Sequence, residues 1–104
     1  MTQTNNTMTV AQTIFEQLGG NRFIAMTGSS HFTGSETHLN MKLTRNAVKA
    51  SYLKIELTPA DTYTMTFYKV DKMLEKTIKA EVTGVYADQL QKVFTSKTGL
   101  YTHM

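Results

Sequence analysis

The chain has 104 residues and a formal net charge of +3, and 40% of its residues are hydrophobic. This length suits one domain with a single hydrophobic core. The sequence contains no cysteine, which excludes disulfides, thiolate zinc sites and cysteine nucleophiles. Every apolar run is shorter than the roughly 18 residues of a membrane-spanning helix, and the first residues do not have the pattern of a signal peptide. We therefore expect a soluble cytoplasmic protein with no membrane partner.

Positive charge is concentrated in the middle of the chain. The segment from Lys42 to Lys79 contains eight cations and four acids, which leaves +4 there and −1 over the rest of the chain. This imbalance is compatible with an anionic partner. An ordinary solvent-exposed surface rich in lysine is the simpler explanation.

The chain begins with a polar segment that precedes the first helical pattern. Residues 1–8 are polar apart from two methionines, and we expect a disordered tail there, followed by a single α+β domain over residues 9–104. That domain starts with apolar residues at helical spacing, such as Ile14 and Leu18. Gly19 and a second glycine follow directly, and glycine readily adopts the left-handed conformation that ends a helix. The pattern predicts one helix that ends at the glycine pair.

Five strands are expected after this helix. The short apolar segment over residues 22–27 predicts a strand with two apolar sides. Four later segments alternate apolar and polar residues, as antiparallel strands do when one face is buried and the other is wet. These four segments are residues 37–44, 51–58, 62–69 and 77–82.

A second helix is expected near the end of the chain, where Leu90 and Phe94 share one side and Gly99 is placed to end it. The predicted order is α-β-β-β-β-β-α. Two amphipathic helices can cover one sheet face, which predicts a two-layer α+β sandwich with a mainly antiparallel five-stranded sheet. The predicted core comprises Val10, Ile14, Leu18, Leu39, Met41, Leu43, Leu53, Ile55, Leu57, Met65, Phe67, Ile78, Val82, Leu90, Val93 and Phe94.

The segment "TGSSHFTGS", residues 27–35, has the glycines and hydroxyls of a phosphate-binding loop. A P-loop needs a strand, two glycines separated by four residues, a lysine and then a helix. Here five residues separate Gly28 from Gly34, Ser35 stands where lysine is required, and the next segment alternates as a strand. We therefore expect a hairpin loop between two strands and no nucleotide site.

No catalytic or metal-binding arrangement stands out in the sequence. The three histidines, His31, His38 and His103, have neither helical spacing nor a neighbouring carboxylate cluster. No serine lies in a G-x-S-x-G elbow, and the carboxylates are scattered. We expect no catalytic residue, no metal ligand and no cofactor, and we do not expect an enzyme.

The polar side of the predicted sheet is the one surface with chemical content. Lysines there are suited to phosphate contacts, and tyrosines are suited to stacking on bases. The candidate binding residues are Lys42, Tyr52, Lys54, Tyr68 and Lys79. Two acids on the same side, Glu56 and Glu81, interrupt the positive field, and strands favour Thr and Tyr whatever their function.

Three segments resemble those of short proteins encoded by phages, prophages and other mobile elements, which usually have no assigned function: "TIFEQLGGNRFIAMTGS", "IELTPADTYTMTFYKV" and "VYADQLQKVFTSKTGLYT". The similarity extends over roughly residues 9–102. It implies a biological setting in a host cell and provides no catalytic residue.

Two functional hypotheses follow from these patterns. The first is a non-catalytic interaction module that binds a host or phage protein. The alternative is a nucleic-acid-binding protein that uses the basic side of its sheet. Exposed apolar residues or an exposed edge strand favour the first hypothesis, and a continuous positive groove favours the second.

Overall fold

The computed structural model describes residues 9–100 and residue 102. It has two helices before a five-stranded antiparallel sheet and one helix after it, so the predicted α+β class and five-stranded sheet are confirmed. The tail predicted over residues 1–8 lies outside the described residues. The elements in chain order are α1 (Thr9–Leu18), α2 (Asn21–Thr27), β1 (Ser30–Gly34), β2 (His38–Lys42), β3 (Tyr52–Leu57), β4 (Tyr63–Val70), β5 (Lys76–Val85), the 3₁₀-helix η2 (Ala87–Gln89) and α3 (Leu90–Thr98).

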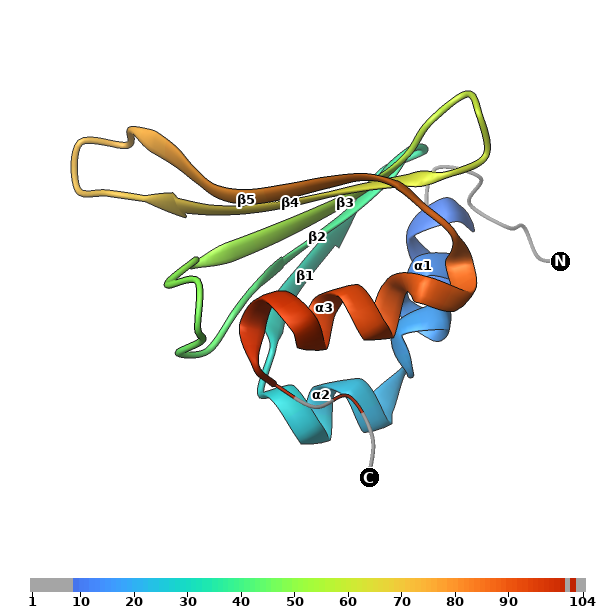
Figure 1. Ribbon diagram of the computed structural model, residues 1–104, viewed down its shortest axis with the longest axis horizontal. Coiled ribbons are helices and arrows are strands. Elements are labelled where there is room, and N and C mark those ends of the chain that lie inside the picture. The colour runs from blue at the N-terminus through green and yellow to red at the C-terminus, as the bar shows by residue number, and fades with distance from the viewer. Residues whose placement is uncertain (1–8, 101, 103–104) are drawn as a thin grey trace, which may run out of the picture.

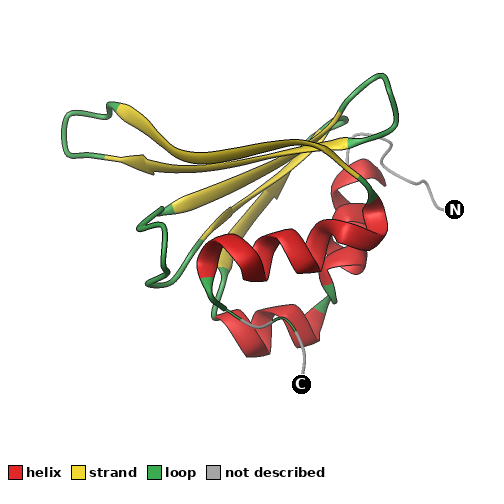
Figure 2. Ribbon diagram, in the orientation of Figure 1, coloured by secondary structure: helices red, strands yellow, loops and turns green. Residues whose placement is uncertain are grey.

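The sheet is a meander in the order β1-β2-β3-β4-β5, and each neighbouring pair is antiparallel. All three helices lie on one side of this sheet (Figure 1), and the two layers are also visible in Figure 2. We call the opposite side of the sheet the free face. The β4–β5 hairpin extends beyond the other strands, away from the helices (Figure 1).

Residues 22–27 belong to helix α2, so the strand predicted there is wrong. Phe23 and Thr27 are buried four residues apart, as on one side of a helix, whereas Ile24 is exposed. Gly28 ends the helix at φ 71°, and its N–H donates to the carbonyl oxygen of Ile24. The prediction failed because a short apolar run has no periodicity that separates a buried strand from a helical turn.

The segment 27–35 contains strand β1, so the hairpin loop predicted there is also wrong. The ring of Phe32 in β1 lies 5.2 Å from Phe15 and 6.5 Å from Phe23 in edge-to-face contacts with the helices. The surrounding Gly, Ser and Thr residues hide this strand in the sequence. A helix comes before this segment and a strand forms within it, which is the reverse of the P-loop order.

The core lies between the helices and the sheet, and it contains most of the residues predicted for it. Val10, Leu57, Val82 and Val93 are partly buried at its border. The fully buried side chains include Ile14, Leu18, Phe23, Met41, Leu53, Ile55, Met65, Phe67, Leu90 and Phe94.

Ile78 was predicted in the core, but it is 50% exposed. Phe67 pairs with Ala80, whereas the next residue of β4, Tyr68, pairs with Ile78. Lys79 is therefore an extra residue in β5. Such a β-bulge reverses the alternation of the strand, which moves Ile78 from the core side to the free face.

Glycines end the helices as predicted. The N–H of Gly20 donates to the carbonyl oxygen of Phe15 at 3.0 Å. Gly99 has φ 76°, and its N–H donates to the carbonyl oxygen of Thr95 at 2.8 Å. Within the described part of the chain, no helix is long and apolar enough to cross a membrane.

Candidate functional site

The free face brings four of the five predicted binding residues, Lys42, Tyr52, Lys54 and Tyr68, into two adjacent rows. Strand register sets both rows, because residues that pair across antiparallel strands point to the same side. One row contains Lys42, Tyr52, Tyr68 and Ile78. The next contains Asn40, Lys54, Thr66 and Glu81.

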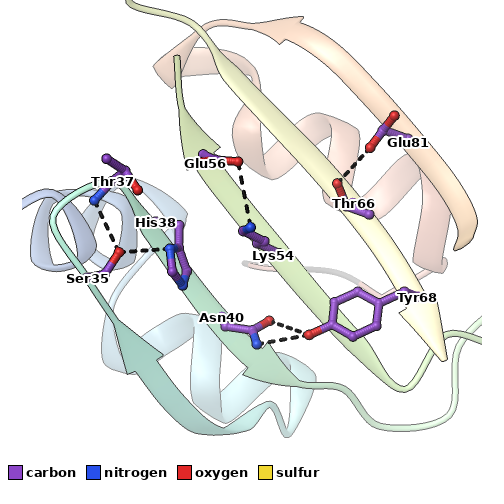
Figure 3. Close-up of polar contacts among 9 residues, drawn as sticks. All are labelled: Ser35, Thr37, His38, Asn40, Lys54, Glu56, Thr66, Tyr68 and Glu81. Carbon is purple, nitrogen blue, oxygen red and sulfur yellow. Dashed lines mark hydrogen bonds and ion pairs between the residues drawn. The ribbon is translucent and has the colours of Figure 1, made fainter. Parts of the chain in front are cut away.

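Tyr68 lies on the free face, but its ring is covered. Only 8% of the residue is exposed. Tyr52 stacks on it with ring centroids 5.5 Å apart, and the Lys76 ammonium lies 4.4 Å from its centroid. Its hydroxyl exchanges hydrogen bonds with the Asn40 amide at 2.9 and 3.1 Å (Figure 3). The ring is therefore not open to solvent, and a base stacks on Tyr68 only if a neighbour moves.

The charges on the free face are partly compensated. The Lys54 ammonium lies 3.7 Å from the Glu56 carboxylate, and Thr66 donates a hydrogen bond of 3.0 Å to Glu81 (Figure 3). Lys79 is exposed at the bulge. The positive field that the sequence suggests for this face is therefore reduced at its centre.

A second feature lies at one end of the sheet, where the β2–β3 loop forms an open hollow of about 730 Å³. We call it the loop hollow. Four cations line it, and no carboxylate is among its described lining residues. The Lys54–Glu56 pair is the one ion pair within the described residues, so none of these cations forms an ion pair with a described acid. They are Lys42, Arg45, Lys49 and Lys69.

The loop hollow has a fixed backbone. The buried Asn46 amide donates to the carbonyl oxygens of Thr44 at 2.7 Å and Ala50 at 2.8 Å, and its oxygen accepts the Ala50 N–H at 3.2 Å. The Ala47 N–H donates to the carbonyl oxygen of Thr98 at the end of α3, at 2.8 Å. Hydrogen bonds of this kind hold a loop in one conformation. The cations are thus presented by an ordered segment.

A third feature is the end of the β4–β5 hairpin, Asp71–Glu75, which we call the hairpin tip. Met73 and Leu74 are 80% and 83% exposed there. The Asp71 carboxylate accepts the N–H groups of Met73 and Glu75, both at 2.9 Å, and its carbonyl oxygen accepts the Leu74 N–H at 3.0 Å. The tip therefore has a defined shape although its side chains face solvent.

Leu74 has φ 64°, in the left-handed region. A residue with a Cβ is strained there by about 1 kcal/mol or more. Most of the Leu74 side chain is exposed, so its own packing offsets little of this strain. The tip thus displays an apolar side chain at the cost of stability.

Titratable groups do not converge elsewhere in the described residues. No group of three or more His, Asp or Glu side chains is placed to hold a metal ion in this part of the chain. His38 is hydrogen-bonded to Ser35 at 2.8 Å, whereas His31 contacts Ser30 at 2.9 Å.

Sequence reasoning overlooked the hairpin tip and the loop hollow as sites. The sequence signal for the tip lies between two strand patterns. It consists of a turn-forming aspartate, Asp71, and two apolar residues shortly after it, Met73 and Leu74. For the hollow, the sequence shows Arg45 and Lys49 only as part of a charged segment. Their convergence with Lys69 from β4 depends on the fold.

Comparisons of the chain with family models, curated proteins and solved structures found no match.

Proposed function

We propose that this chain is a small, non-catalytic interaction module of the kind encoded by phages and mobile elements, acting in the host cytoplasm. It binds a host or phage protein through the hairpin tip. Met73 and Leu74 carry this proposal, because both are highly exposed on a backbone that Asp71 fixes. Burial of such apolar surface against a partner is favourable by about 25 cal/mol per Å².

The shape and charge of the tip indicate what kind of partner it fits. A tip that is already ordered loses little conformational freedom on binding, which favours affinity. The two apolar side chains fit a hydrophobic pocket. Four lysines within the tip or next to it outnumber the two acids of the tip, so we expect the rim of that pocket to be acidic. These lysines are Lys69, Lys72, Lys76 and Lys79.

Strand β5 offers a second contact next to the tip. It is an outer strand of the sheet among the described elements, and it is exposed along most of its length. An outer strand can pair with an extended segment of a partner through its backbone. The bulge at Lys79 limits such pairing to the half of β5 that lies next to the tip.

A retention experiment with a matched pair of variants tests this function. We expect the immobilised wild-type chain to retain a specific protein from nuclease-treated host extract. The double variant Met73→Gln/Leu74→Asn should lose it, because both apolar contacts disappear, while asparagine tolerates the left-handed conformation. With the purified partner, the affinity should fall by at least about tenfold.

The control is Ile24→Gln, which removes another exposed apolar side chain, on α2. It should bind as the wild type does. Equal retention by the double variant contradicts the proposal, and so does a partner that is retained only when nucleic acid is intact.

Nucleic-acid binding at the free face is a second candidate function. It is supported by Lys42 and Lys79, which are exposed and form no ion pair with described residues. It is weakened by the covered ring of Tyr68. Titration with single-stranded and duplex oligonucleotides tests this function, and affinity weaker than about 100 μM at physiological salt contradicts it.

A further inference from the structure

We infer that the loop hollow is a binding site for phosphate groups that carry several negative charges. The inference does not depend on the hairpin tip, because no residue of the tip lines the hollow. It rests on the charge, the donor chemistry, the rigidity and the size of the hollow.

The cationic side chains that line the hollow form no ion pair with a described acid. The residues that line the hollow include Lys42 from β2, Arg45 and Lys49 from the β2–β3 loop and Lys69 from β4, and no carboxylate is among its described lining residues. Like charges gathered in this way raise the local potential and repel one another. An anion with two or more charges relieves that repulsion, whereas a singly charged ion relieves less of it.

The donors suit phosphate oxygens. The planar guanidinium of Arg45 can donate two parallel hydrogen bonds to one phosphate group, and the lysines act as mobile point charges around it. Ser51, whose side chain carries a hydroxyl, also lines the hollow. The hydroxyl of Thr44 is already used, because it donates to the Thr27 carbonyl oxygen at 2.7 Å.

The backbone of the β2–β3 loop is ordered without a ligand. Asn46 and Ala47 hold it to the rest of the domain through the hydrogen bonds described above, so the loop does not have to become ordered around a ligand. Lys49 has φ 60°, a left-handed conformation that is costly for a lysine. Strained residues of this kind often occur at binding sites.

The size of the hollow and the residues that line it indicate which part of a ligand it recognises. A hollow of about 730 Å³ is larger than one phosphate group needs and lies within the range of small-ligand sites. Its lining contains no aromatic ring on which a base stacks. We therefore expect recognition of phosphate groups and not of bases, so that tripolyphosphate and a nucleoside triphosphate bind with similar affinity.

Calorimetric titration of the full chain with inorganic tripolyphosphate tests the inference. The key variant is Arg45→Gln/Lys49→Gln, and its matched control is Arg22→Gln/Lys92→Gln, which removes one arginine and one lysine at exposed positions outside the hollow. The key variant should weaken binding by about tenfold or more, because it removes charge-assisted hydrogen bonds. The control should change affinity by less than about threefold, since distant exposed charges are screened by salt. Thermal unfolding of both variants checks that each is folded.

The source of the phosphate is identified by competition with a single-stranded oligonucleotide. Displacement of tripolyphosphate by the oligonucleotide shows that the site accepts a nucleic-acid backbone, and tripolyphosphate binding without displacement favours a free polyphosphate compound. Equal weakening by the key variant and the control overturns the site. The absence of tripolyphosphate binding to the wild type up to about 1 mM at low salt also overturns it.

Discussion

The carbonyl oxygen of Asp71 accepts the N–H of Leu74 at 3.0 Å, and this bond closes the β4–β5 hairpin with Leu74 at φ 64°. Leucine fits this conformation poorly, and a side chain that is 83% exposed gains little from packing. Stability of the domain therefore does not explain a leucine at this position. The proposed contact with a partner offers an explanation.

Replacement of Leu74 by asparagine should stabilise the isolated domain. Asparagine accepts the left-handed conformation more readily, so we expect Leu74→Asn to raise the free energy of unfolding by about 0.5–1 kcal/mol. Urea denaturation measures the change. Met73→Asn is the control, because Met73 does not have a positive φ, and it should give no such gain. A less stable Leu74→Asn chain contradicts this explanation of the tip.

Removal of the Asn46 side-chain amide should free the β2–β3 loop from the hydrogen bonds that hold its backbone. Asn46 is buried and makes three hydrogen bonds to the loop backbone, so Asn46→Ala should lower the free energy of unfolding by about 2–4 kcal/mol. Thr44→Val removes a single hydrogen bond and should cost only about 1 kcal/mol. Thermal or urea denaturation compares the two variants, and equal costs contradict a central role for Asn46.

Stability measurements on two variants should show which candidate binding residue stabilises the fold and which does not. Tyr68→Ala removes a ring that is covered by Tyr52 and Lys76, so we expect a loss of stability of about 3 kcal/mol. Lys79→Ala changes an exposed side chain and should alter stability by no more than about 0.5 kcal/mol. Denaturation curves of the two variants measure this difference, and a stable Tyr68→Ala chain contradicts it.

Exposed lysines, and not Tyr68, are thus the informative variants for nucleic-acid binding. If Lys42 and Lys79 contact phosphates, the double alanine variant reduces the slope of log affinity against log salt by about 1–2 units. Fluorescence titration with a single-stranded oligonucleotide at several salt concentrations measures the slope. Lys92→Ala on α3 is the control and should leave the slope unchanged. If the double variant also leaves the slope unchanged, neither Lys42 nor Lys79 contacts a phosphate.

Stability at alkaline pH should depend on Tyr63. Burial raises the pKa of its phenol above the usual value of 10.0. A raised pKa in the folded state gives stability that is complete below the unfolded pKa and is lost as pH rises through the folded pKa. Above about pH 10, the unfolding free energy should therefore fall more steeply in the wild type than in Tyr63→Phe. Tyr86→Phe changes an exposed residue and should keep the wild-type steepness, and urea denaturation over a pH series checks both.

The local sequence pattern was sufficient to predict helices α1 and α3 and strands β2, β3 and β4. Each of these elements shows its buried side through residues that are close in the chain, as Leu53 and Ile55 do in β3. Glycine signals were also sufficient for the helix ends at Gly20 and Gly99, because the left-handed conformation is a property of a single residue. The same alternation placed Lys54 on the free face.

Contacts between distant segments set the rest of the structure. Phe23 packs on Phe94 with ring centroids 4.9 Å apart, and this contact helps to make residues 22–27 a helix although their composition suits a strand. The bulge at Lys79 depends on the register between β4 and β5. Arg45 and Lys69 line the same hollow only because the sheet brings the β2–β3 loop beside β4. No local pattern contains these features, because the partner of each residue lies far along the chain and the balance between alternatives is decided by packing.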